Sequence, residues 1–544
     1  MEGIKRSQAP ACPSTAAAPP PKAPPPPSAA AKTPLLPSSS PCSHPGSPRR
    51  ATTMDIDFEF VLRVLPAPSV STTGSLSAAA DGGHDGEDHL SNLPDGLLGD
   101  IVSLLPVTFA MRTTVLSERW RNVWHSAPLV LYDAHIPAAS KSARFAIVAR
   151  VFAKNTGAFR TVHLARCSFE SRAPELAECS RRLAAGGVQD LVLLNEPIER
   201  SVGRDEEILP AEILRCDALR SLYLGYWKLA DVASLPGGDF FPKLEKLGLL
   251  NMFLGNHVLD RLLAASPLLT HALILWHQRP DDRLHLRGQS LRCVVFYHST
   301  VEELALLDAP LLDRLIMRCT WRRRHKWDPR DLMRVKIARA PRLRVLGYLD
   351  AMEHQLQIGD TVIQADTLAS PRSVVPSVRV LAVMVNLNAF EQVKALFSFL
   401  SCFPNLETLH VKKSAVAAKP NSLNPEKFFQ NLGPIECLQS HIKKVVLHDV
   451  HFLGDIPFLR CFCQRAQALQ SLVLMVRDEL APVLLGGMDL ASYLAYPTRA
   501  GQCCTVLFVN SDAEGSWSYH RSSDLSVDDP FFTQGGQQLF HISV

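Results

Sequence analysis

Two short segments of this 544-residue chain combine residue types that are able to do chemistry. His448-Asp-Val-His451 brings two imidazoles close together in the sequence, as a pair of metal ligands would be. Trp321-Arg-Arg-Arg-His-Lys-Trp327 sets a dense group of cations between two aromatic side chains, as a phosphate-binding site would. An acidic third ligand is not evident beside the histidines, and a run of charges usually forms a solvated loop. A solvated histidine pair at a strand end and a solvated basic loop are therefore the favoured interpretations.

The sequence offers no motif of an enzyme class. It has no Gly-rich phosphate loop, no Gly-x-Ser-x-Gly elbow and no His-Glu-x-x-His helix. The 13 cysteines are scattered without zinc-site spacing, which favours buried free thiols. We therefore expect a non-catalytic protein with no cofactor and no metal. A hydrolase on an α/β frame is the remaining catalytic alternative, and it lacks a nucleophile motif.

Charge and hydropathy restrict the partners. The net charge is +4, and the first 50 residues hold six basic residues and one acid, so the rest of the chain is close to neutral. A neutral body argues against nucleic-acid binding. Because no apolar run is long enough to span a bilayer and no leader is evident, we expect an intracellular protein of the cytoplasm and/or nucleus, with no membrane contact. The Pro/Ala/Ser-rich start weakly resembles a transit peptide; a plain disordered tail is favoured, and Met54 is an alternative start.

Two or three short helices are predicted after residue 90. Apolar residues recur at helical spacing on one side of the first helix, at Leu97, Leu98, Ile101, Leu104 and Leu105. Pro106 ends this helix, and Met111, Val115, Leu116 and Trp120 continue the pattern in the second. About forty residues cannot bury this much apolar surface among themselves, so the unit needs a covering surface.

The string from Leu90-Ser-Asn-Leu-Pro-Asp-Gly-Leu-Leu to Pro106, followed by Arg112-Thr-Thr-Val-Leu-Ser-Glu-Arg-Trp-Arg-Asn-Val-Trp124, resembles a plant-type F-box. The resemblance implies docking on a Skp-family adaptor and, through it, on the cullin of an SCF-type ubiquitin ligase. Carried over by position, the implied adaptor contacts are Leu93, Pro94, Leu97, Ile101, Leu104, Leu105, Val115, Leu116 and Trp120. Thr108-Phe109 and Met111 stand where the family usually has Lys-Asp and a second Ala. The alternative is an amphipathic hairpin that packs on its own chain.

A repeat follows, with apolar residues at a start position and at +3 and +5. Its twelve starts are Phe159, Val188, Leu219, Leu244, Leu269, Leu291, Leu312, Leu343, Val378, Leu406, Ile442 and Leu469. The average spacing of about 28 residues lies in the range of leucine-rich repeats. This predicts an α/β fold: a short helical unit followed by an irregular solenoid, with a parallel β-sheet on its concave face and helices or turns on its convex face.

The residue between positions +3 and +5 should point from the concave sheet. This column is uncharged: His163, Val192, Tyr223, Gly248, Leu273, Val295, Ile316, Gly347, Ala382, His410, Val446 and Val473. Apolar packing in ladders along the sheet is one interpretation. The other is a surface that binds an unknown target protein, for which the candidates are Tyr223, Leu273, Val295, Ile316, Arg318 and His410.

Residues 436–475 and Asp524-Leu-Ser-Val-Asp-Asp-Pro-Phe-Phe532 resemble the FBD region and the tails of one large plant F-box family. The predicted division is a disordered tail and linker (1–87), an F-box (88–130), a leucine-rich-repeat solenoid (131–435), FBD-like terminal repeats (436–476) and a C-terminal extension (477–544). The resemblance implies the substrate-recognition subunit of an SCF-type ubiquitin ligase. The alternative is a repeat scaffold or sensor that does not join a ligase.

Overall fold

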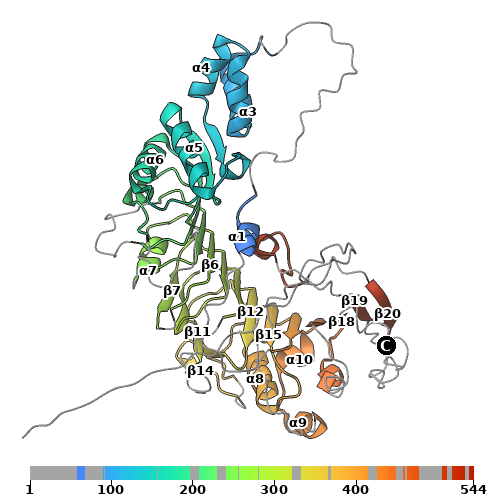
Figure 1. Cartoon of the computed structure of the whole chain (residues 1–544). Helices are drawn as coiled ribbons and strands as arrows, with labels where there is room; N and C mark the ends of the chain where they lie inside the picture. The colour runs from blue at the N-terminus through green and yellow to red at the C-terminus, as the bar shows by residue number, and fades with distance from the viewer. Residues whose placement is uncertain are drawn as a thin grey trace, which may run out of the picture. The chain divides into compact units, whose positions relative to one another are not determined.

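A computed structural model gives the arrangement of the chain (Figure 1). It describes residues 58–67, 90, 92–155, 157–195, 207–229, 241–254, 257–279, 281–320, 332–365, 369–414, 425–448, 458–459, 462–476, 505–510, 518–532 and 538–543. The basic Trp321–Trp327 cluster and His451 lie outside these residues, as does most of the predicted tail and linker.

The described residues build one sheet of 15 strands. In spatial order these are β1 (Leu129–Tyr132), β2 (Phe159–Leu164), β3 (Asp190–Leu194), β4 (Ser221–Gly225), β5 (Lys246–Leu250), β6 (His271–Leu275), β8 (Cys293–Tyr297), β10 (Arg314–Arg318), β12 (Val345–Asp350), β15 (Val380–Met384), β16 (Thr408–Lys412), β17 (Lys444–His448), β18 (Ser471–Val476), β19 (Thr505–Asn510) and β20 (Gln538–Ser543). Every pair is parallel except β19–β20. The predicted solenoid sheet is confirmed, and each of the twelve repeat starts leads into one of its strands.

The register of the sheet aligns the predicted column. His163 pairs with Val192, which pairs with Tyr223, and the same row runs on through Leu273 to Ile316. A second stretch of the row continues from Ala382 to Val473. Residues at +3 and +5 point to the opposite face and form the main core of the repeats. We call the side of the sheet that carries the column the ladder face.

A second sheet lies behind the middle repeats, where helices or turns were predicted. Its five strands, in order, are β14 (Thr361–Val362), β13 (His354–Ile358), β11 (Met333–Ile337), β9 (Glu303–Asp308) and β7 (Arg283–Arg287). Each strand from β7 to β13 follows one strand of the main sheet in the sequence. Their alternating apolar residues, such as Leu284 and Leu286, are buried toward the core.

Helices cover the same side of the main sheet at both ends of the repeats (Figure 1). They are η2 (Asp133–His135), α5 (Lys141–Lys154), α6 (Ala173–Gly186), η3 (Ala211–Arg215), α7 (Val258–Ala264), α8 (Phe390–Ser401), α9 (Pro425–Asn431) and α10 (Glu436–Ser440). Between helices α8 and α9, Phe397 packs against Phe428 and Phe429. The core behind the sheet is therefore continuous from helix-backed to strand-backed repeats.

The predicted helical unit precedes the first strand. It consists of α2 (Asp95–Ser103), α3 (Val107–Arg112), η1 (Thr113–Val115) and α4 (Glu118–Ser126). Its inner residues, among them Leu98, Val102 and Trp124, belong to the same hydrophobic cluster as the first repeats. Pro106 makes a parallel bridge with Val130 of β1, and Arg160 of β2 donates to the Ser103 carbonyl at 3.3 Å.

Two further segments lie on the ladder face. Within the segment predicted to be disordered, residues Phe58–Val64 form helix α1, because Val61, Val64 and Leu65 find apolar partners on the sheet. This is a correction to the predicted tail. Near the C-terminus, α14 (Tyr519–Ser523) and the residues after it up to 532 lie on the same face. Figure 1 shows α1 beside the red C-terminal segment, and His520 Nε2 donates to the Arg63 carbonyl at 3.1 Å.

Three histidines are buried without charge in the repeats. Burial lowers the pKa of His163 to about 3 and the pKa values of His298 and His354 to about 4. Nearby cations add to this shift at His163 and His298, whereas a hydrogen bond to the Thr320 carbonyl partly opposes it at His354. An unfolded histidine has a pKa of about 6.5. The unfolded chain therefore binds more protons between about pH 6.5 and 4, and each of these residues lowers the stability as the pH falls through that window.

We expect His354→Gln to flatten the pH dependence of stability. Between pH 7.5 and pH 5, His354 should lower the free energy of unfolding of the wild-type protein by roughly 2 kcal/mol. The variant lacks this contribution. Urea denaturation of both proteins at the two pH values measures the difference. An equal loss of stability in wild type and variant would contradict the neutral, buried state of His354.

Candidate functional site

Exposed apolar side chains gather on the helical unit. Six large apolar residues within 90–116 are 50–83% exposed: Leu90, Leu97, Leu104, Met111, Val115 and Leu116. Among the residues that the structure describes, only Ile208 and Leu268 are other large apolar side chains of this exposure. Such a concentration is typical of a surface that another protein covers. We call these six residues the apolar face.

The two sides of α2 explain how this face arises. Leu98 and Val102 point into the core, whereas Leu97 and Leu104, seven residues apart, share the outer side of the helix. Arg119 of α4 ties the start of α2 in place: its Nε bonds Asp95 at 2.6 Å, and its guanidinium also donates to the Leu93 carbonyl. The apolar face is therefore held on a folded support.

The structure distributes the nine predicted adaptor contacts over three environments. Leu97, Leu104, Val115 and Leu116 are exposed on the apolar face, and Pro94 is exposed at the start of α2. Leu93, Ile101 and Leu105 are half-buried against the core. Trp120 is only 7% exposed, and its backbone N–H bonds the Ser117 side chain that caps α4. The implied adaptor contacts did not include two further exposed residues, Leu90 and Met111, although Met111 belongs to the helical pattern of the sequence.

The candidate target-binding residues on the ladder face are placed differently. Tyr223, Leu273, Val295, Ile316 and His410 lie on the same face of the sheet, but all five are buried, and Arg318 is half-buried. Residues of α1 and of the C-terminal segment 518–532 cover them. A replacement such as Ile316→Asp would therefore put a charge into a closed interface, and so it does not separate target binding from packing.

Helix α1 covers the ladder face through aromatic contacts. The ring of Phe60 stacks on Tyr297 at 5.0 Å and meets the edge of Trp276 at 5.6 Å. Trp276 has a positive φ of 56°, as have the residues that follow β4, β5, β8 and β10. Its N–H still bonds the Tyr297 carbonyl of the next repeat at 3.0 Å, so the turn brings the ring to α1 without losing the ladder of hydrogen bonds.

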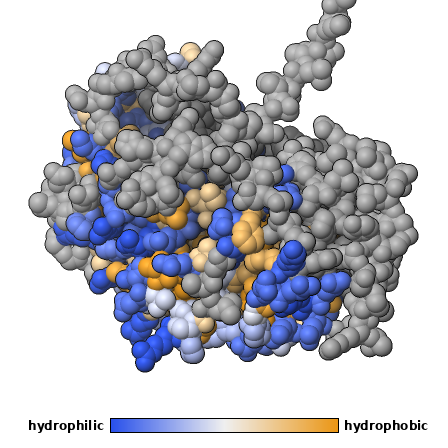
Figure 2. Space-filling model, turned by 90° about the horizontal axis from the view of Figure 1, so that it is seen from below, coloured by the Kyte–Doolittle hydropathy of each residue, from blue (hydrophilic) through white to orange (hydrophobic). Residues whose placement is uncertain are grey.

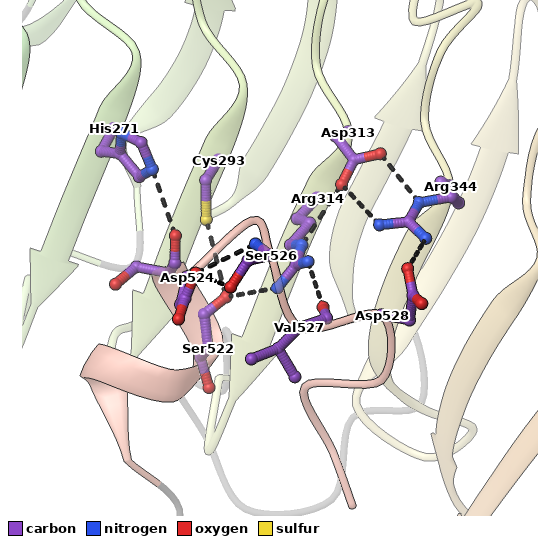
Figure 3. A network of polar contacts seen from close by, with 11 residues as sticks. His271, Cys293, Asp313, Arg314, Arg344, Ser522, Asp524, Ser526, Val527 and Asp528 are labelled. Carbon is purple, nitrogen blue, oxygen red and sulfur yellow. Dashed lines mark hydrogen bonds and ion pairs between the residues drawn. The ribbon is translucent and has the colours of Figure 1, made fainter.

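The C-terminal segment is held through its backbone carbonyls (Figure 3). Arg314 has no exposed side-chain surface, and its guanidinium donates to the carbonyls of Ser522, at 3.2 Å, and Val527. His271 Nε2 donates to the Ser523 carbonyl at 3.1 Å. The hydroxyl of Tyr223 lies 3.3 Å from the hydroxyl of Tyr519. A Cβ at Gly248 would lie 2.2 Å from the Tyr223 ring. Glycine at 248 thus makes room for the tyrosine that meets the segment.

Further along, the segment is held through its side chains. Arg344 bonds Asp528 at 2.9 Å, and Asp529 receives His410 Nε2 at 2.9 Å and Lys444 at 3.3 Å. Burial alone would raise the pKa of Asp529, but His410 and Lys444 outweigh it and hold that pKa well below its usual range. Phe531 packs against the rings of Tyr348 and His410.

His448 of the predicted histidine pair contacts a different histidine. Its Nε2 lies 3.0 Å from Nδ1 of His410 on the adjacent strand. Burial, His410 and the nearby cations Lys412 and Arg318 lower its pKa well below the usual value. His448 therefore supports the residue that binds Asp529. Sequence spacing could not reveal this contact between neighbouring strands.

Figure 2 shows a face on which the described residues are mainly hydrophilic, with hydrophobic side chains gathered near its middle. Among the described residues, no helix has the length and apolarity to cross a bilayer.

Two family models match the chain. The model described as "F-box domain" matches residues 90–132, which carry the apolar face. The model described as "FBD-associated F-box protein At5g56370, LRR repeats" matches residues 176–411, within the sheet. The chain therefore contains an F-box domain and leucine-rich repeats of the FBD-associated type. The helical unit is accordingly the F-box, and the predicted family and α/β repeat fold are both confirmed.

Relatives with both kinds of domain in their names are found in Arabidopsis thaliana. The F-box/LRR-repeat protein At3g26922 is 34% identical over 27% of this chain and 47% of its own length. The putative F-box/FBD/LRR-repeat protein At2g05300 is 29% identical over 42% of this chain and 52% of its own. The chain thus spans about half the length of these curated relatives. An internalin from Listeria monocytogenes, 12% identical over 57% of this chain and 79% of its own, has a TM-score of 0.23, too low for any conclusion.

Proposed function

We propose that this F-box protein is the substrate-recognition subunit of an SCF-type (cullin–RING) ubiquitin ligase. In this proposal the apolar face of the F-box docks on a Skp-family adaptor, and the repeats hold a target protein. The observation that supports it is the concentration of exposed large apolar side chains at residues 90–116 of an F-box.

The energetics favour docking by the apolar face. Burying a leucine-sized side chain contributes about 1.5–3 kcal/mol, and each of these six residues has at least half of its surface left to bury. Several such contributions exceed the loss of freedom on association by enough for a specific complex. Arg112, Arg121 and Glu118 are exposed near the face and would form its polar rim.

The contribution of this chain to ubiquitin transfer would be positional. The F-box core and the repeat core are one hydrophobic cluster, so a target held on the repeats would be kept at a defined place relative to the adaptor. Such placement raises the local concentration of target lysines near the conjugating enzyme. The bond chemistry would belong to partner subunits, and this chain would need no cofactor.

Mixing the purified full-length chain with a purified Skp-family adaptor tests the proposal. Size-exclusion chromatography with light scattering should show a 1:1 complex at micromolar concentrations. The second candidate, a repeat scaffold or sensor outside any ligase, is favoured by Thr108, Phe109 and Met111, which depart from the family pattern. That candidate predicts two separate peaks in the same experiment.

A further inference from the structure

The ladder face of the repeats is occupied by the chain itself. Residues 518–532 cross seven strands, from β6 at His271 to β17 at Lys444, without pairing with any of them as a strand. Their large side chains that become fully buried are Tyr519 and Phe531. The segment therefore resembles a peptide bound in a groove more than a layer of the core.

The ladder face contacts this segment in two ways. Arg314 and His271 hold the main-chain carbonyls of Ser522, Ser523 and Val527, the first two at the C-terminal end of helix α14. The other contacts depend on side chains of the segment. Asp528 pairs with Arg344, and Asp529 pairs with His410 and Lys444. Two aromatic residues of the segment follow. Phe531 packs against Tyr348, and Lys444 Nζ lies 4.0 Å above the ring of Phe532.

Charge and burial indicate which contacts carry specificity. The segment has three acids and one arginine, opposite the cationic Arg314, Arg344 and Lys444. The side chain of Asp528 is 92% exposed, so its ion pair with Arg344 contributes little. The side chain of Asp529 is 21% exposed and faces a fully buried His410. This pair should therefore strongly favour a peptide with an acidic residue at this position over one without it.

We propose that this part of the ladder face is a peptide-binding groove for an acidic–aromatic segment of a target protein. The groove selects an acidic residue followed closely by aromatic side chains. The chain's own residues 518–532 fill it in the free protein, and a target segment of the same chemistry binds by displacing them. The inference rests on the proposed function in that the displaced segment gives way to a target, but peptide binding itself requires no adaptor.

The test uses a fluorescently labelled peptide with the sequence of residues 518–532 and the full-length chain. Because the resident segment competes at a high effective concentration, wild-type protein should bind the probe weakly. Asp529→Asn with Phe531→Ala in the chain weakens the resident segment and should tighten probe binding at least tenfold, as measured by fluorescence anisotropy. A peptide carrying the same two substitutions should bind this variant at least tenfold more weakly than the probe.

A pair of neighbouring lysines provides the matched control. In the background of the weakened segment, Lys444→Gln should lower probe affinity at least fivefold. Lys443→Gln should leave it unchanged, since Lys443 bonds Glu407 and not the segment. If the double variant loses its cooperative thermal transition, Asp529→Asn alone replaces it.

Two outcomes would overturn the inference. Probe binding no tighter to the weakened variant than to wild type would mean that the segment is a fixed part of the fold. Equal binding of the two peptides would mean that the groove does not read the acidic–aromatic sequence. Either result leaves adaptor docking untouched, because the adaptor is absent from the experiment.

Discussion

Replacing Leu97 and Leu116 by aspartate in the full-length chain should lower its affinity for a Skp-family adaptor at least 100-fold. Both side chains are at least half exposed on the apolar face, so the substitutions should leave the core intact. In the complex, each would remove an apolar contact and place an unpaired carboxylate in a dry interface, which costs several kcal/mol. A 100-fold loss corresponds to about 2.7 kcal/mol. Isothermal titration calorimetry of variant and wild type measures the change.

The matched control is Leu268→Asp. Leu268 is 51% exposed and lies outside the F-box, so the same chemical change should not alter adaptor affinity. Thermal melts of all three proteins should coincide within a few degrees. If the Leu97→Asp, Leu116→Asp variant bound the adaptor as tightly as wild type does, the apolar face would not be the docking site.

Arg314→Met should be strongly destabilising, in contrast to the previous substitutions. Methionine keeps the apolar stem but removes the guanidinium, which is buried between the carbonyls of Ser522 and Val527 and the carboxylate of Asp313. Breaking a buried charged network of this kind costs about 3–5 kcal/mol. We expect a clear loss of denaturant stability together with faster amide exchange throughout 518–532.

Arg379→Met provides the comparison for Arg314. Arg379 pairs with Glu407 at 3.1 Å, and both side chains are partly exposed, so its loss should cost less than about 1 kcal/mol. Amide exchange in 518–532 should be unchanged in this variant. If both arginine variants behaved alike, the C-terminal segment would not be anchored by Arg314.

The sequence alone was sufficient to predict much of the main sheet and its register. Each repeat start lies next to its strand in the sequence, so the spacing of Leu219, Leu222 and Leu224 records which residues face the core. The second sheet was missed, although Arg283-Leu-His-Leu-Arg287 alternates as a half-buried strand does. The repeat pattern reports only the residues of the main sheet, and helices or turns were expected between its strands.

The cover of the ladder face could not be predicted from local patterns. Tyr519 meets Tyr223 across 296 residues, and His520 meets Arg63 across 457. Helix α1 is seven residues long, too short for its periodicity to distinguish it from a linker. For the F-box the sequence indicated an apolar stripe, but only packing decides that Leu98 is buried and Leu97 is exposed.

Amide hydrogen exchange of the full-length chain, with and without an equimolar Skp-family adaptor, tests the central claim most directly. That claim is that the apolar face of the F-box is a docking surface waiting for another protein. The account predicts that the adaptor slows exchange at residues 97–116 and leaves the strands of the ladder face unchanged. Unchanged exchange at 97–116 in the presence of adaptor, or slowing confined to the repeats, would contradict it.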